Sequence, residues 1–268
     1  MERPQRHDHW SAGDAYEPYV GRWSRLVAAD FLRWLESPAG LDWLDVGSGT
    51  GALTRAILDQ AQPRSVRSVD LSSDFIAYAR AHVVDKRVAF EVADARALRY
   101  DDASFDAAVS GLALNFVPQP ERAAAEMARV ARPGGVVATY LWDYAGRMEF
   151  MRAFWDAAAA LDPAAAALDE GRRFPLCRPE PLAALWQAAG LDGVEVRPID
   201  IPTHFRDFDD FWMPFLGGQG PAPGYVASLA EAQREALRER LRASLPVDAG
   251  GALRLTARAW AVRGYAQT

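Results

Sequence analysis

Cysteine is scarce in this sequence, and its scarcity limits the chemistry available to the protein. Cys177 is the single cysteine among 268 residues, so an intrachain disulfide and a cysteine-based metal cluster are both excluded. A chain that uses no disulfide fits a reducing compartment. We therefore expect a cytoplasmic protein with no metal site.

Long runs of one kind of residue are also lacking. No stretch of lysine and arginine forms a basic stripe, and the net charge is −6, which disfavours a long nucleic-acid duplex as substrate. The amino-terminal segment is polar, and no segment has the apolar length of a signal-peptide core or of a membrane span. We expect neither nucleic acid nor membrane among the partners.

The motifs of covalent hydrolases are missing as well. There is no Gly-x-Ser-x-Gly nucleophile elbow, and Cys177 has no obvious base beside it in the sequence. Hydrophobic residues nevertheless make up 50% of the chain and charged residues 25%, so a packed core is expected.

The stretch that organises the chain is residues 41 to 52, which read LDWLDVGSGTGA. An apolar run typical of a buried strand leads into glycines 47, 49 and 51, and apolar residues at helical spacing follow. Glycines adopt backbone angles closed to other residues and let a ligand approach the main chain, where a helix N-terminus favours an anionic group. The pattern predicts a cradle for a nucleoside with an anionic tail.

Two cofactors fit this cradle. Residues 47 to 52 satisfy the dinucleotide pattern G-x-G-x-x-A, and Asp70 follows at a distance suited to a ribose hydroxyl. Asp45 argues against a dinucleotide and favours a positively charged nucleoside, because a carboxylate two positions before Gly47 would repel a pyrophosphate and attract an ammonium or sulfonium. A nicotinamide-dependent dehydrogenase remains the enzymatic alternative, although no Tyr-x-x-x-Lys pair is evident.

Strands and helices alternate through the first half of the chain, which favours a doubly wound parallel sheet. The second half interrupts this alternation twice and ends on an alternating strand. The pattern predicts strands at 41–46, 65–71, 88–92, 105–118 with its exit, 136–142, 194–201 and 253–262, and helices at 11–36, 52–58, 75–81, 120–131, 149–161, 181–189 and 227–245.

Leu44 to Gly51 closely resembles the first motif of class I S-adenosylmethionine-dependent methyltransferases, in particular the small-molecule, UbiE/type-11-like branch. Residues 19 to 24, YVGRWS, and residues 127 to 135, MARVARPGG, are similar to two further segments of that family. The resemblance implies a Rossmann-like, mostly parallel seven-stranded sheet with an antiparallel edge strand and a helical cap. It also implies S-adenosylmethionine as cofactor.

The resemblance assigns roles around this cofactor. Asp70 would bind the ribose, Asp94 would lie by the adenine amino group with apolar neighbours beside the ring, and Arg22 would meet the cofactor carboxylate. The full set of cofactor-binding candidates is Tyr19, Arg22, Asp45, Gly47, Ser48, Gly49, Gly51, Asp70, Leu71, Asp94, Ala95 and Ser110.

The same reading divides the chain into a core and its cover. Residues 1–40 are expected to form a helical lid, 41–144 the cofactor-binding core, 145–178 a cap insertion and 179–205 a continuation of the core. Residues 206–250 form a second helical cap insertion, and residues 251–268 the terminal edge strand.

Methyl transfer is a direct displacement, so the protein must chiefly hold two partners close and exclude water. If the acceptor loses a proton, His204, Tyr16 and Asp143 are the candidate bases. Any single aromatic residue between 205 and 216 is expected to belong to the core of the cap, while the cluster as a whole suggests an apolar or aromatic acceptor. The candidate acceptor contacts are Trp23, Asn115, Trp142, Phe211 and Trp212. The Asn/Asp-Pro-Pro-aromatic motif of base-methylating relatives is absent after residue 114.

The prediction is therefore a methyltransferase that moves a methyl group to an O, N, S or C atom of a small molecule, acting as a monomer or homodimer. A noncatalytic nucleoside-binding regulator that kept the pocket is the alternative from another class.

Overall fold

The computed structural model describes residues 17–218 and 220–267 of the chain. Within these ranges the chain divides into two compact units. Unit 1 takes in residues up to 23 together with 143–175 and 200–258, and unit 2 takes in 24–142, 176–199 and 259 onward. Each is described by itself.

Unit 2 is built on the sheet, whose strand order is β3-β2-β1-β4-β5-β7-β6. The strands β1 (Asp42–Val46), β2 (Ser65–Asp70), β3 (Val88–Val92), β4 (Phe105–Gly111) and β5 (Ala131–Trp142) are parallel to their neighbours. The strands β6 (Asp192–Phe205) and β7 (Leu253–Tyr265) complete it. Because β7 is antiparallel to β5, the predicted mostly parallel seven-stranded sheet is confirmed.

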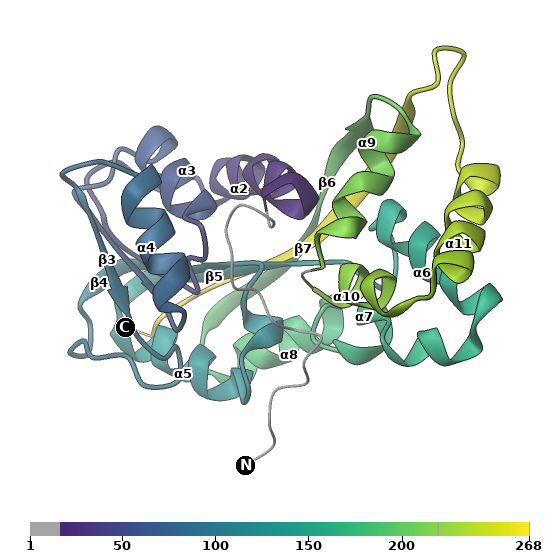
Figure 1. Ribbon diagram of the computed structural model, residues 1–268. Coiled ribbons are helices and arrows are strands. Elements are labelled where there is room, and N and C mark those ends of the chain that lie inside the picture. The colour runs from purple at the N-terminus through teal and green to yellow at the C-terminus, as the bar shows by residue number, and fades with distance from the viewer. Residues whose placement is uncertain (1–16, 219, 268) are drawn as a thin grey trace. The chain divides into compact units, whose positions relative to one another are not determined.

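Helices cover both faces of this sheet. In Figure 1, α3 (Ala52–Gln60) and α4 (Ser73–His82) lie on one face, and α5 (Pro120–Val130) and α8 (Pro179–Ala188) lie on the other. Ser72 caps α4, since its hydroxyl accepts from the backbone N–H of Phe75 at 3.3 Å. Both faces of β1 and β4 are covered, and their apolar residues are almost wholly buried.

Two boundaries differ from the sequence prediction. The sequence predicted a helix over 120–131 and a strand only from residue 136, yet β5 already begins at Ala131, which pairs with Phe105 before an irregularity in the register. Ahead of the sheet, the described chain begins with a π-helical turn, η2 (Glu17–Gly21), and the α-helix α2 (Arg22–Leu35) follows. The predicted single helix is therefore two elements over its described part.

Unit 1 is helical and packs around aromatic side chains. Its helices are η2, α6 (Glu149–Leu161), η4 (Pro163–Ala167), α7 (Glu170–Arg173), α9 (Phe208–Trp212), η5 (Met213–Gly217), α10 (Pro221–Ser228) and α11 (Glu231–Ser244), and it also contains the end of β6 and the start of β7. The rings of Phe154 and Phe215 stack with centroids 4.6 Å apart, and Phe211 lies 5.4 Å from Phe215. Helix α10 was not predicted, because its Pro-Ala-Pro-Gly start is typical of a loop.

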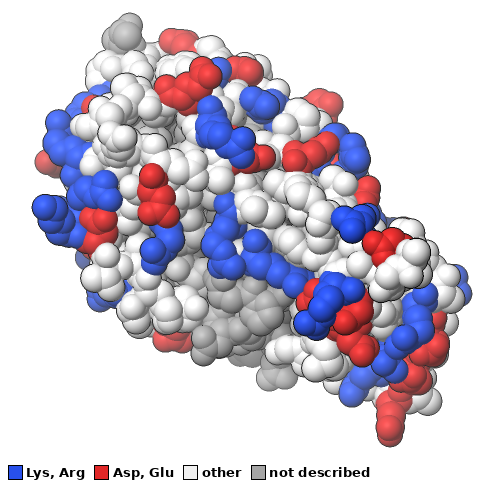
Figure 2. All heavy atoms as spheres, turned by 90° about the horizontal axis from the view of Figure 1, so that it is seen from above, with Lys and Arg blue, Asp and Glu red and all other residues white. Residues whose placement is uncertain are grey.

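Charged side chains of both signs are interspersed on the face drawn in Figure 2, where basic groups lie mostly beside acidic ones. Among the described helices, none combines the length and the apolar character needed to cross a bilayer.

Candidate active site

The glycine turn between β1 and α3 has the geometry of a ligand cradle. Gly47, Gly49 and Gly51 have φ values of 74°, 52° and 89°, in the left-handed region that favours glycine. A Cβ at Gly47 would lie 2.5 Å from the Cβ of Ala113, and one at Gly51 would lie 2.9 Å from Val83, whereas one at Gly49 would meet nothing within 4 Å. The outer glycines are required by packing, and Gly49 faces open space beside the turn.

Asp45 lies at the end of β1 and is fully buried. Its Oδ2 accepts a hydrogen bond from the Thr54 hydroxyl at 2.6 Å, and that hydroxyl also lies 2.8 Å from the Ser68 hydroxyl. Burial raises the pKa of Asp45 to about 7, and the nearby charge of Asp70 adds to the rise. The carboxyl group of Asp45 is therefore enclosed by the protein.

Asp70 ends β2 and ties the glycine turn to that strand. Its Oδ2 accepts from the backbone N–H of Gly49 at 2.9 Å, and its Oδ1 accepts from the N–H of Ser72 at 2.8 Å. Burial raises the pKa of Asp70 although these hydrogen bonds oppose the shift. Each oxygen keeps a lone pair for a further donor.

Three buried oxygens around this edge have no hydrogen-bond partner within the described chain. They are Asp45 Oδ1, Ser48 Oγ and Ser110 Oγ. Ser48 is in the glycine turn, and Ser110 is near the end of β4, the strand that pairs with β1. Because buried polar groups are rarely left unpaired, such a group of oxygens fits a polar ligand.

The candidates at the ends of β2 and β3 lie at neighbouring positions, since Asp70 pairs with Val92. Leu71 is 68% exposed, an unusual exposure for a leucine that follows a core strand. Asp94 forms an ion pair with Arg96 at 2.7 Å, and this pairing lowers the pKa of Asp94. Ala95, between them, is half-buried.

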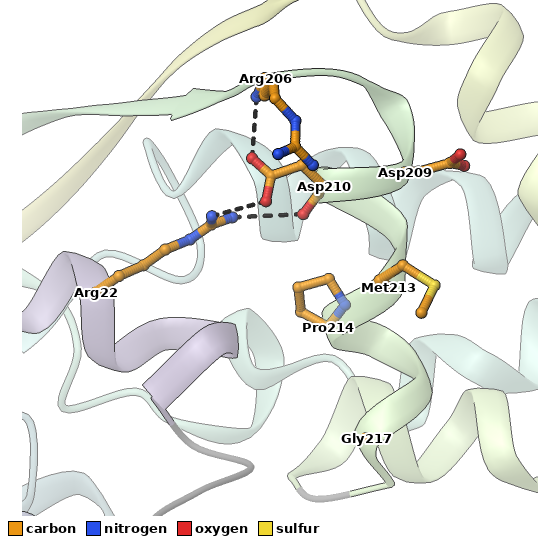
Figure 3. Close-up of a pocket in the computed structure, with 7 residues that line it drawn as sticks. All are labelled: Arg22, Arg206, Asp209, Asp210, Met213, Pro214 and Gly217. Carbon is orange, nitrogen blue, oxygen red and sulfur yellow. Dashed lines mark hydrogen bonds and ion pairs between the residues drawn. The ribbon is translucent and has the colours of Figure 1, made fainter.

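Unit 1 brings together a different group of candidates. Arg22 Nη1 donates to Asp210 Oδ1 at 2.9 Å, and its guanidinium lies 4.5 Å from the ring centroid of Trp23 and 4.8 Å from that of Phe205. Figure 3 shows this ion pair beside a cavity of about 410 Å³, which Arg206, Met213 and Pro214 also line. Tyr19 is buried and donates from its hydroxyl to Met151 Sδ at 3.1 Å.

The predicted acceptor contacts are mostly core residues. Trp23, Phe211 and Trp212 are buried in the aromatic core of unit 1, and Trp142 is buried at the end of β5 in unit 2. Asn115 is half-buried in the short helix η3 (Leu114–Phe116) at the exit of β4. Of these five candidate contacts, Asn115 alone is not a buried core residue.

Of the three candidate bases, the structure describes His204 and Asp143, and it gives neither the surroundings of a proton-transfer site. His204 is on the exposed face of β6, between the buried residues Thr203 and Phe205. Asp143 is buried and its oxygens accept from the backbone N–H groups of Gly146 at 3.0 Å and Arg147 at 2.9 Å. Tyr16 lies outside the described residues.

Sequence reasoning missed the residues that support these side chains. Thr54 and Ser68, which enclose Asp45, are fully buried hydroxyls on otherwise apolar faces of α3 and β2. A polar residue at a predicted core position was the available signal. Asp210, the partner of Arg22, is 188 positions away along the chain, and no local pattern indicates it.

The comparison with known families decides what this core is. A family model described as "Methyltransferase domain" matches residues 44–139, which run from β1 through the glycine turn to β5. This stretch of the chain is therefore similar to a methyltransferase domain. The methyltransferase match thus spans the edge at which Asp45, Asp70, Ser48 and Ser110 gather.

Individual methyltransferases agree with this assignment. An uncharacterized methyltransferase of Mycobacterium leprae is 35% identical over 132 residues, which are 45% of this chain and 48% of that protein, so the chain spans about half the length of this relative. Methyltransferase GfsG of Streptomyces halstedii is 29% identical over 223 residues, 80% of this chain and 77% of its own. Phosphoethanolamine N-methyltransferase 2 of Haemonchus contortus, solved with S-adenosyl-L-methionine, shares the fold alone, with a TM-score of 0.59, 18% identity, and coverage of 95% of this chain and 56% of that chain.

Proposed function

We propose that this protein transfers a methyl group from S-adenosylmethionine to a small-molecule acceptor. The observation that carries the proposal is the carboxyl edge of β1, β2 and β4. It leaves two carboxylates, Asp45 and Asp70, with no basic partner among the described side chains, beside buried oxygens that lack hydrogen bonds. A ligand with ammonium, sulfonium and hydroxyl groups would satisfy them.

The residues of the cradle fit this donor. Gly49 offers open space, and Asp70 has lone pairs for ribose hydroxyls. The exposed Leu71 side chain, with Asp94 and Ala95 beyond it, suits the adenine end, while Asp45, Ser48 and Ser110 suit the amino-acid end. When bound, the donor supplies an electrophilic methyl group.

Tyr19 and Arg22 are weaker parts of the proposal. Arg22 is held by Asp210 and Tyr19 by Met151. For Arg22 to bind the cofactor carboxylate, a fork–fork contact would have to replace or share the contact with Asp210. We keep Arg22 as a candidate on the family resemblance, and the cofactor assignment does not depend on it.

The chain's own contribution to the reaction is positioning and the exclusion of water. We assign no general base, since Asp143 serves the backbone of its own turn and His204 lies on an exposed strand face. The aromatic cluster makes the core of unit 1 hydrophobic. Contact between an apolar acceptor and Trp23, Trp142, Phe211 or Trp212 would therefore require local opening that exposes these side chains.

Calorimetry with S-adenosylmethionine, S-adenosylhomocysteine and NAD tests the cofactor. We expect saturable binding of the first two and none of NAD. Asp70→Asn should weaken S-adenosylmethionine binding about tenfold, since a hydrogen bond to a charged group contributes roughly 1.5–3 kcal/mol. Asp74→Asn is the matched control, because Asp74 is an exposed residue of the first turn of α4 and should leave affinity unchanged.

Two results would overturn the proposal. Binding of NAD in place of both sulfur nucleosides would make the protein a dinucleotide enzyme. Binding of S-adenosylmethionine with no labelled methyl product from phenols, thiols, amines and N-heterocycles would favour the noncatalytic regulator.

A further inference from the structure

Two buried hydroxyls form a chain of hydrogen bonds behind Asp45 in unit 2. The Thr54 hydroxyl lies 2.6 Å from Asp45 Oδ2 and 2.8 Å from the Ser68 hydroxyl, and all three side chains are fully buried. Polar groups are costly to bury, and these two hydroxyls lie on otherwise apolar faces of α3 and β2. The cofactor contacts proposed above use neither of them.

The direction of this chain follows from the number of protons. Thr54 has one hydroxyl proton and donates it to Asp45, so its oxygen accepts and Ser68 is the donor of the second hydrogen bond. Asp45 and Ser68 are paired positions of β1 and β2, and Thr54 is in the first turn of α3. Three elements therefore hold a chain of donors that ends on the carboxylate, and hydrogen bonds to a charged acceptor are the stronger ones.

The chain occupies one oxygen of Asp45 and leaves the other. Oδ1 is buried and has no hydrogen-bond partner among the described residues. The groups that face Asp45 are Thr54 from α3 and Ser68 and Asp70 from β2, while its partner on β4 is the apolar Val109. Burial raises the pKa of Asp45 to about 7, the Thr54 hydroxyl opposes this rise more than any other group does, and Asp70 adds to it.

We propose that Thr54 and Ser68 are positioning residues, whose hydroxyls hold Asp45 Oδ2 and so keep Oδ1 for the ammonium group of the methyl donor. They also favour the ionised carboxylate that this contact needs, because burial alone disfavours its charge. The inference rests on the function proposed above and deepens it, since it names the residues that set the pH range of donor binding. A purely structural role would tie α3 to β2 and would act equally at every pH.

The titration of Asp45 in the ligand-free protein tests the hydroxyl chain. NMR of the carboxyl carbon, with Asp45→Asn used to identify the signal, should give a wild-type pKa of about 7. Thr54→Val removes the hydroxyl, keeps the branched shape, and should raise that pKa by about one unit. Thr54→Ser should keep the wild-type value. Ser68→Ala should raise it by less than Thr54→Val, and gives the same test if Thr54→Val does not fold.

Proton release tests the link to the donor. Calorimetry of S-adenosylhomocysteine binding, in buffers of different ionisation enthalpy, counts the protons that the ligand displaces. At pH 7 wild-type protein should release roughly half a proton and Thr54→Val roughly 0.9, because more of its Asp45 is protonated. The affinity of Thr54→Val should be about fivefold below wild type at pH 7 and nearly equal to it at pH 9.

Thr203→Val is the matched control. Thr203 is fully buried as well, but its Oγ1 has no hydrogen-bond partner in the described chain, and it lies on β6 within unit 1. The same change of side chain at this position should leave the titration of Asp45, the proton release and the affinity as they are in wild type.

The failures are distinguishable. If wild-type protein does not bind S-adenosylhomocysteine, the proposed function itself is wrong. If Thr54→Val leaves the titration of Asp45 unchanged, or if Thr54→Ser shifts it as far, the role of the hydroxyls is wrong while methyl transfer stands. If Thr54→Val loses the same affinity at pH 7 and pH 9, the hydroxyl serves only the structure, and the inference is overturned.

Discussion

The two edges of the sheet in unit 2 differ in how the carboxylates of β1, β2 and β4 are paired. At the amino edge, Asp42 and Asp106 begin β1 and follow the start of β4. Arg64 Nε donates to Asp42 Oδ1 at 2.8 Å, and Arg132 Nη1 lies 2.6 Å from Asp106 Oδ1. Hydrogen bonds from Arg64 lower the pKa of Asp42 well below its usual range.

At the carboxyl edge of the same strands, the described chain sets no arginine or lysine against Asp45 or Asp70. Burial instead raises the pKa of both. Asp42 and Asp45 are three residues apart on β1, so the strand itself does not cause the difference. The protein neutralises its acids where they serve the fold and leaves them without a cation where we propose that a cationic ligand binds.

The largest expected effect comes from blocking the carboxyl edge. Gly47→Ala should destabilise the protein by about 2–5 kcal/mol, because a left-handed residue with a Cβ costs roughly 1–2 kcal/mol and the overlap with Ala113 adds roughly 1–3 kcal/mol. Calorimetry should detect no binding of S-adenosylmethionine to the folded variant.

Gly40→Ala is the control from the amino edge. Gly40 has φ 81° with nothing within 4 Å of a built Cβ, so the change should cost only the conformational part, about 1–2 kcal/mol, and leave donor affinity intact. Equal losses of affinity in the two variants would show that the two edges do not differ as described.

The second effect is a pH dependence of donor binding. Asp45 has a pKa of about 7 in the protein without ligand, so a cationic donor must displace its proton at lower pH. Affinity for S-adenosylmethionine should fall about tenfold per pH unit below pH 7, or about 100-fold between pH 8 and pH 5. Asp45→Asn should bind more weakly at pH 8 and lose this slope.

The control for that experiment is in unit 1. Burial also raises the pKa of Glu170, which accepts from Trp155 Nε1, to about 7. Glu170→Gln should therefore keep the slope if Asp45 is its source. If the slope persisted in Asp45→Asn and disappeared in Glu170→Gln, Glu170 in unit 1 would be its source, and the role of Asp45 in donor binding would be contradicted.

The sequence was sufficient for the sheet and for the position of the cradle. Residues 41 to 52 carry both periodicities and the glycines in one continuous stretch, and β1, the turn and α3 follow them closely. Ser72 likewise marks the start of α4 by a local capping rule. Such features depend on neighbours along the chain, so pattern reasoning can reach them.

Local sequence patterns could not predict the residues that contact the site side chains. Arg22 was predicted from its motif, yet Asp210 binds it from a helix far along the chain. The aromatic residues between 205 and 216 were expected to be core residues individually and to suggest an apolar acceptor as a cluster, and Phe211 and Phe215 do lie in the core of unit 1. Composition indicates that aromatic residues gather, but packing decides whether they face a ligand or one another.

The smallest expected effect sharpens the comparison between the edges. Asp42→Asn should cost about 1 kcal/mol or less at pH 7, because its partner Arg64 is largely exposed and exposed ion pairs contribute little. The folded-state pKa of Asp42 is lowered, so its contribution is present above the unfolded pKa of about 4 and is lost as pH falls below it.

The slope at Asp45 has the opposite sign. Its raised pKa means that the folded state holds an extra proton between about pH 4 and pH 7, so stability from this group falls as pH rises through that window, at up to about 1.4 kcal/mol per unit. Chemical denaturation of wild type, Asp42→Asn and Asp45→Asn at pH 3, 5 and 8 separates the two. Asp42→Asn should lie closer to wild type at pH 3 than at pH 8 and retain full donor affinity, while Asp45→Asn should gain stability relative to wild type at pH 8. Slopes of the same sign at both positions would mean that the two edges hold their acids alike.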